Sequence, residues 1–153
     1  GYSYVAGYGY ANDTPEYVCS GLVESGRLAL GEARVRPSQL ESINAWAPGH
    51  DTIDAGEARA MAELLGKWLR QIPAVSVKGS LGAALGAAGA MQVGVAALSQ
   101  RFGVIPPTVN WEYPDPACPL NLSGIARSLP HESTLVNAHG VGSVNSSLVL
   151  QRC

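Results

Sequence analysis

Strand-like and helix-like segments alternate along most of the chain, and this order limits the folds that it can adopt. Strands are predicted up to Asn12, at Ile43–Trp46 and at Ala74–Lys78, where aromatic, alternating or β-branched residues dominate. Helical patterns follow these strands, at about 14–30, 54–71 and 81–102. Because a strand that returns to its sheet through a helix runs parallel to the strand before it, the alternation predicts an α/β layer.

Two further strands are predicted near the C-terminus. Thr134–Ala138 and Ser147–Leu150 flank the glycine-containing segment His139–Ser143, so we expect a hairpin. The expected fold is α/β, with a mixed, mostly parallel five-stranded sheet flanked by helices. No internal repeat or linker interrupts the pattern, so residues 1–153 are predicted to form a single domain.

Local signals predict where the helices begin. Thr14 precedes Pro15 and Glu16, which places an N-cap residue before a proline and an acid in the first turn. Asp54 and Glu57 have the spacing of a capping box in which Asp is the N-cap. The third helix is rich in glycine and alanine, which would let another element approach closely or serve internal packing alone.

Charged residues are scarce and nearly balanced. They make up 14% of 153 residues, against about 25% in an average soluble domain, and the formal net charge is −2. With no basic field, neither nucleic acid nor a membrane is expected as a partner. The charge-free stretch 79–100 is dominated by small residues, so a buried helix is expected rather than a membrane span. The first residues lack the pattern of a signal peptide, and a cytoplasmic location is predicted.

The three cysteines, Cys19, Cys118 and Cys153, lack the spacing of a metal site and cannot all pair with one another. Reduced thiols with structural roles are therefore predicted. We expect no metal and no cofactor.

Four further segments carry motifs: Trp46–Glu57 (WAPGHDTIDAGE), Val77–Gly89 (VKGSLGAALGAAG), Gly103–Cys118 (GVIPPTVNWEYPDPAC) and Asn137–Asn145 (NAHGVGSVN). In this order and spacing they resemble the C-terminal half of β-ketoacyl synthases, thiolase-like enzymes that condense acyl groups on an acyl carrier protein. The matching family motifs are His-Gly-Thr-Gly-Thr with Asp-x-x-Glu, Lys-Ser-x-x-Gly-His, the connecting segment, and the turn Asn-Ser-Phe-Gly-Phe-Gly-Gly-x-Asn. The resemblance covers nearly the whole chain and implies a thiolase-like half.

The resemblance also implies that the family's reactive residues are missing. The family holds the acyl chain on a cysteine and uses two histidines to decarboxylate the malonyl extender and stabilise the enolate oxygen. Trp46 and Ala83 stand at the two histidine positions, and neither side chain can shuttle a proton. The cysteine belongs to the family's N-terminal half, which these 153 residues do not include. No catalytic residue is therefore predicted in this chain.

Other matches imply scaffold residues. Asp54 and Glu57 match the Asp-x-x-Glu pair, although helix capping also explains them. Lys78 matches the family's lysine near the pocket, and a solvated lysine at a strand end is the alternative. His50 is expected at the tip of a surface loop.

The glycine-rich turn gates the acyl pocket in the family. Asn137, Gly140 and Gly142 match it, whereas His139 and Val141 replace both phenylalanines. The two glycines keep the backbone freedom of the turn. We expect the gate to be altered or unused.

Two functions of different classes stay open. The first is a non-catalytic, chain-length-factor-like ketosynthase subunit or half-subunit that supports acyl-carrier-protein-dependent Claisen condensation in fatty acid or polyketide biosynthesis. The second is an active acyltransferase or ketosynthase-type enzyme that uses a cysteine from an N-terminal partner chain and a non-standard base such as His50 or His139. A fragment of a longer protein is also compatible with the sequence.

Protein partners follow from the same resemblance. They are an N-terminal ketosynthase half or an active ketosynthase subunit, and an acyl carrier protein, in a dimer or higher oligomer. The low charge agrees with this expectation, because one face would be buried against another polypeptide.

Overall fold

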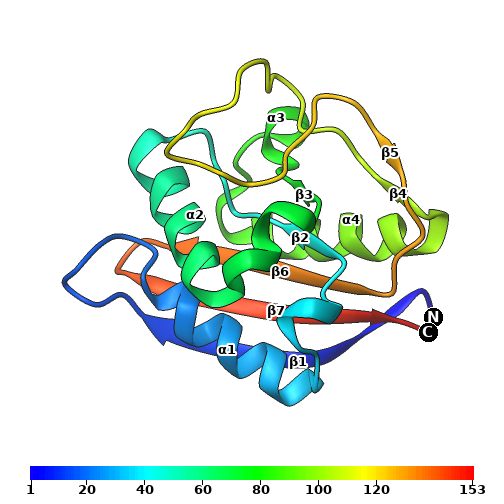
Figure 1. Ribbon diagram of the computed structural model, residues 1–153, viewed down its shortest axis with the longest axis horizontal. Coiled ribbons are helices and arrows are strands. Elements are labelled where there is room, and N and C mark those ends of the chain that lie inside the picture. The colour runs from blue at the N-terminus through cyan, green and yellow to red at the C-terminus, as the bar shows by residue number, and fades with distance from the viewer.

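The computed structural model describes residues 1–153, and five of its strands form one sheet in the order β1-β7-β6-β2-β3 (Figure 1). These strands are Ser3–Asn12 (β1), Ser42–Asn44 (β2), Ala74–Val75 (β3), Ser133–Gly140 (β6) and Val144–Arg152 (β7). Val104–Ile105 (β4) and Arg127–Ser128 (β5) pair separately. The helices are Gly21–Ala33 (α1), Asp51–Leu65 (α2), Lys78–Leu81 (α3) and Ala88–Phe102 (α4), with 3₁₀ turns at Pro37–Gln39 (η1), Gly66–Gln71 (η2) and Leu85–Ala87 (η3).

The predicted mixed five-stranded sheet with flanking helices is confirmed. β1 and β6 both pair antiparallel with β7, while β2 pairs parallel with β6 and with β3. The parallel share is therefore half of the pairings and not most of them. Both antiparallel pairings involve β7, which follows β6 directly in a hairpin and also pairs with β1, the first strand of the chain.

Helices cover both faces of the sheet (Figure 1). α1 contacts β1 and β7 and packs against α2, and α4 contacts β6 and β7. Successive residues of β7 point to opposite faces. Val149 joins the core that contains α1 and α2, whereas Leu150 packs with Ala96 of α4. We call the α1 and α2 side the outer face and the α4 side the inner face.

Two glycines allow α1 to lie directly on β1. A side chain at Gly7 would overlap the Ala29 carbonyl group, and one at Gly9 would overlap the Ser25 carbonyl group. The tyrosine that stands between these glycines, Tyr8, consequently points to the inner face.

The first helix begins later than predicted. α1 begins at Gly21, and the residues before it form turns instead of continuing a helix from Thr14. The Thr14 N–H donates to Ser20 Oγ at 2.8 Å, and the Thr14 hydroxyl donates to the Glu16 carboxylate at 2.9 Å. These residues stabilise a turn, and the positive φ of 67° at Cys19 is incompatible with helix there.

The other two helices also differ from prediction. α2 begins at Asp51, so Asp54 and Glu57 lie inside the helix and do not form a capping box. The helix predicted at 81–102 is interrupted between α3 and α4, where Gly82 has a φ of 71°. None of the helices combines the length and apolar character that crossing a membrane requires.

Candidate functional site

Glu57 of α2 is completely buried and accepts three hydrogen bonds. Its Oε1 accepts from the Trp46 N–H at 2.9 Å and from Asn137 Nδ2 at 3.0 Å, and its Oε2 accepts from the Ala47 N–H at 2.8 Å. Burial raises the pKa of Glu57, while these hydrogen bonds and nearby Lys78 partly oppose the rise. The carboxylate therefore holds the segment after β2 in place and, with it, the backbone of Trp46.

Asn137 of β6 connects this carboxylate to the rest of the outer face. Its Nδ2 also donates to Met61 Sδ at 3.3 Å, and its Oδ1 accepts from Ser147 Oγ at 3.1 Å. Ser147 Oγ lies 3.0 Å from Ser25 Oγ of α1. Every member of this chain of contacts is buried, so it fixes β6 and β7 against both outer helices.

Gln92 of α4 holds the same strand ends from the inner face. Its Nε2 lies 2.9 Å from the Ala45 carbonyl oxygen and 3.1 Å from both the Asn137 carbonyl oxygen and Asn44 Oδ1. Its Oε1 accepts from Lys78 Nζ at 3.3 Å. Sequence reasoning missed Gln92, and the only signal was one amide side chain within a run of small residues.

Lys78 opens α3 and is only 7% exposed, so a solvated lysine at a strand end does not describe it. Its Nζ lies 4.1 Å from the centroid of the Trp46 ring, and no carboxylate oxygen lies within 4 Å. Burial lowers the pKa of Lys78 to about 8, although Glu57 and Asp54 act to raise it. The site therefore holds a buried amine that stacks on an indole and lacks an ion-pair partner.

A cavity of about 320 Å³ is lined by Lys78 and Asp54. Asp54 Oδ2 accepts from the Gly49 N–H at 3.1 Å, whereas its Oδ1 is buried without a hydrogen-bond partner. Burial raises the pKa of Asp54. The other lining residues include Pro48, Ser76, Thr108, Trp111 and Leu122.

His139 stands near the end of β6, away from this cavity. Its Nδ1 lies 2.9 Å from Asn145 Oδ1 and 3.9 Å from Asp13 Oδ2. Asn145 Nδ2 donates to Asp13 Oδ1 at 2.7 Å. In the turn that follows, Val141 is fully exposed and Gly142 has a φ of 91°, which requires glycine-like freedom.

Four of the predicted positions, Asp54, Glu57, Lys78 and Asn137, therefore gather with Trp46. Ala83, the second position matched to a family histidine, is exposed in the segment between α3 and η3. His50 is exposed directly before α2, as expected for a surface loop.

All three cysteines are free thiols, as predicted. Burial raises the pKa of Cys19 to about 12 and that of Cys118 to about 11, so neither is a ready thiolate. Cys153 is exposed. No three potential metal ligands of the His, Cys, Asp or Glu type come together.

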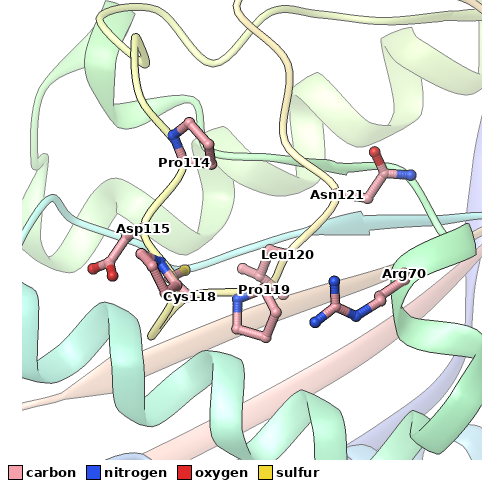
Figure 2. Close-up of a pocket in the computed structure, with 8 residues that line it drawn as sticks. Arg70, Pro114, Asp115, Cys118, Pro119, Leu120 and Asn121 are labelled. Carbon is pink, nitrogen blue, oxygen red and sulfur yellow. The ribbon is translucent and has the colours of Figure 1, made fainter.

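A second cavity, of about 330 Å³, lies beside the proline-rich loop (Figure 2). Arg70 of η2 lies at one side of it and Asp115 at the other, with Cys118 and Pro119 between them. Among its lining side chains only Asp115 and Asn121 make hydrogen bonds, to their own loop and to Arg127. It is the weaker candidate for chemistry.

A family model described as "Beta-ketoacyl synthase, C-terminal domain" matches residues 2–112. The chain belongs to this family. Among ketosynthase relatives, it is 33% identical over 159 residues to the tetracenomycin polyketide synthase ketoacyl synthase alpha subunit of Streptomyces glaucescens, covering 99% of this chain and 37% of that protein. It is 38% identical over 127 residues to the corresponding beta subunit, covering 82% and 31%. The 3-oxoacyl-[acyl-carrier-protein] synthase 2 of Coxiella burnetii is 31% identical over 157 residues, covering 99% and 38%.

Solved ketosynthases have the same fold. A type II polyketide synthase acyl-carrier protein in complex with its ketosynthase superposes with a TM-score of 0.94 at 26% identity, covering 99% of this chain and 39% of that one. The ishigamide ketosynthase/chain length factor gives 0.91 at 29% identity, covering 98% and 38%. The predicted thiolase-like half is therefore confirmed. The chain spans between 31% and 39% of the length of these relatives and solved structures.

Proposed function

We propose that this chain is the C-terminal half of a non-catalytic, chain-length-factor-like ketosynthase subunit. In this role it supports acyl-carrier-protein-dependent Claisen condensation by an active ketosynthase in fatty acid or polyketide biosynthesis. The proposal depends above all on Trp46, whose indole stands where the family carries a histidine and stacks on Lys78. An indole N–H only donates, so it cannot accept a proton during decarboxylation, and Ala83 offers only a methyl group at the second position.

The intact scaffold beside these losses also supports this function. Glu57 retains its hydrogen bonds to the segment after β2 and to Asn137, so the fold around the former reaction centre is kept. Relatives named as alpha and as beta ketosynthase subunits both match most of this chain. A solved relative is named as a ketosynthase/chain length factor.

The inner face is the proposed contact with an N-terminal ketosynthase half. Tyr8 pairs with Leu148, which packs on the α4 side, and Tyr8 remains 52% exposed. On α4 itself, Leu98 is 46% exposed and Phe102 is 72% exposed. Burying these side chains against a partner would remove apolar surface from water, which the low charge of the chain also favours.

The catalytic part of the proposal is tested by decarboxylation of a malonyl-loaded acyl carrier protein. We expect the assembly of this chain with its N-terminal half to release CO₂ at the background rate. Addition of the active ketosynthase should start condensation, and omission of this subunit should stop it. Decarboxylation above background by the assembly alone would contradict the proposal.

The partner is tested by sedimentation of the 15.9 kDa chain alone and with its N-terminal half. We expect a dimer, a higher oligomer or a complex with that half. A stable monomer that does not bind the half would exclude the proposed interface.

A second candidate function is an active acyltransferase that uses the partner's cysteine and His139 as a non-standard base. Asn145 Nδ2 donates to Asp13 Oδ1 and to the Ser143 carbonyl oxygen, so Asn145 Oδ1 faces His139 and accepts a hydrogen bond from the Nδ1–H of its ring. The neutral ring then keeps its free electron pair on Nε2. His50 has no comparable partner and is disfavoured as the base.

Mass spectrometry separates the two functions. An acyl group that transfers from an acyl thioester to the partner's cysteine in the wild-type assembly, and about 100-fold more slowly with His139→Phe, supports the second. His50→Phe is the control and should not change the rate. The absence of an acyl group on that cysteine supports the non-catalytic subunit.

A further inference from the structure

The chain has two lysines, and each lies over a tryptophan ring in a different environment. Lys67 Nζ lies 5.0 Å from the centroid of the Trp68 ring and is exposed to solvent. Lys78 is buried, and its Nζ makes one hydrogen bond, to Gln92 Oε1, and one cation–π contact, with the Trp46 ring. An ammonium group has three hydrogens to donate, so Lys78 keeps at least one that no oxygen in the chain accepts.

Lys78 also lines the 320 Å³ cavity, whereas Lys67 lines none of the principal cavities. Pro48, Trp111 and Leu122 give this cavity apolar walls. Asp54 adds a carboxylate oxygen that is buried without a partner. The cavity therefore offers an amine beside an apolar space, with one negative group nearby.

We propose that Lys78 is an acylation site that takes short, uncharged acyl groups from acyl thioesters. The neutral amine attacks the thioester carbonyl carbon and forms an N–C bond while the C–S bond breaks. The sulfur leaves as a thiolate and takes up the proton that the nitrogen loses. The products are an amide on Lys78 and a free thiol, and the balance needs no further reactant.

Burial favours this reaction because it lowers the pKa of Lys78 to about 8. About a tenth of the amine is then neutral at pH 7, against less than about a thousandth for a solvated lysine. Two carboxylates of α2, Glu57 and Asp54, face the amine and act in the opposite direction. The product amide is uncharged, so acylation would remove the cation from the Trp46 ring.

The inference goes beyond the proposed function and can be tested on the chain alone. The probe is the acetyl thioester of N-acetylcysteamine at pH 8, with acetylation of each lysine measured by peptide mass spectrometry. In the folded chain we expect Lys78 to react at least about fivefold faster than Lys67, and in urea the two rates should become equal. A folded chain in which Lys78 reacts no faster than Lys67 overturns the proposal.

The choice of acyl group is tested with the malonyl thioester of the same carrier. Because Asp54 would repel the malonyl carboxylate, Lys78 should prefer acetyl over malonyl about threefold more strongly than Lys67 does. Asp54→Asn should remove this difference and leave the ratio at Lys67 unchanged. Equal ratios of acetylation rate to malonylation rate at both lysines of the wild-type chain would show that the acyl group does not bind in this cavity.

Discussion

The outer and inner faces of the sheet are stabilised by different kinds of interaction. On the outer face, one cluster of 19 buried apolar residues joins α1 and α2 to the sheet. On the inner face, α4 contributes Ala96 to one cluster of three buried apolar residues and packs Val95 against another cluster of three. Buried amides supply much of the remaining contact, because Gln92 and Gln100 each hydrogen-bond several strand atoms.

The outer face therefore has a complete apolar core, whereas the inner face is held by hydrogen bonds and keeps apolar surface exposed. Apolar burial on the outer face is continuous, so its helices need no further cover. The amides of the inner face fix the position of α4 but leave its Leu98 and Phe102 exposed. A helix that hydrogen bonds hold in place, and whose apolar side is exposed, is suited to pack against another polypeptide.

The largest expected effect is the difference between the two faces in the free energy of unfolding that a Leu→Ala substitution removes. Leu22 of α1 is fully buried, so Leu22→Ala should lower the free energy of unfolding by about 3–5 kcal/mol through loss of apolar contact and a residual cavity. Leu98→Ala on α4 should cost less than about 1 kcal/mol in the isolated chain. Urea unfolding measures both, and similar costs would remove the distinction between the faces.

Removing an amide anchor should have the next largest effect. Gln92→Leu leaves the carbonyl oxygens of Ala45 and Asn137 and the Nζ of Lys78 without this partner, which should cost about 2–4 kcal/mol. The matched control is Gln71→Leu, because Gln71 is exposed. If thermal unfolding of the two variants coincides, apolar contacts alone hold α4 in place.

Lys78, which Gln92 of the inner face contacts, should make the free energy of unfolding of the chain depend on pH. Its pKa in the folded chain is about 8, lowered from 10.5, so the unfolded chain binds more protons between these values and stability rises with pH there. After allowance for solvent screening at the cavity, the rise is about 1–2 kcal/mol.

Lys78→Met should remove this rise, whereas Lys67→Met should keep it. The comparison at each pH between wild type and variant cancels the opposite contributions of Cys19 and Cys118, whose raised pKa values make stability fall as alkaline pH ionises the unfolded thiols. Urea titrations between pH 8 and 10 measure the difference. A rise of equal size in Lys78→Met would assign it to another group.

Sequence patterns predicted the sheet better than the helix ends. Alternation and β-branching near Ile43 and Val149 reflect burial on a sheet, which the strand itself imposes. Thr14 and Asp54 have side chains that cap helices and turns equally well, so their spacing alone does not separate the two outcomes. The partners that the fold provides, Ser20 for Thr14 and Gly49 for Asp54, lie six and five residues away, and the three-residue capping pattern does not include them.

Prediction of the site from the sequence was limited in the same way. The resemblance located Trp46, Glu57 and Lys78 because each stands inside a motif. Gln92 could not be found in this way, since its role depends on strand ends that are 45 to 48 residues distant and meet only in the fold. The unpartnered oxygen of Asp54 is likewise a property of the folded cavity.

The smallest expected effect is on the rates at which the cysteine thiols are modified, and it reports on local opening of each face. Cys19 lies in the outer cluster and its raised pKa of about 12 leaves little thiolate, while Cys153 is exposed. An aromatic disulfide reagent at pH 8 should therefore modify Cys153 first and Cys19 only when the outer face opens. Leu22→Ala should accelerate the modification of Cys19, and Leu98→Ala should leave it unchanged. If both variants accelerate it equally, the two faces open as one cooperative unit, and their contrast is one of composition rather than of local stability.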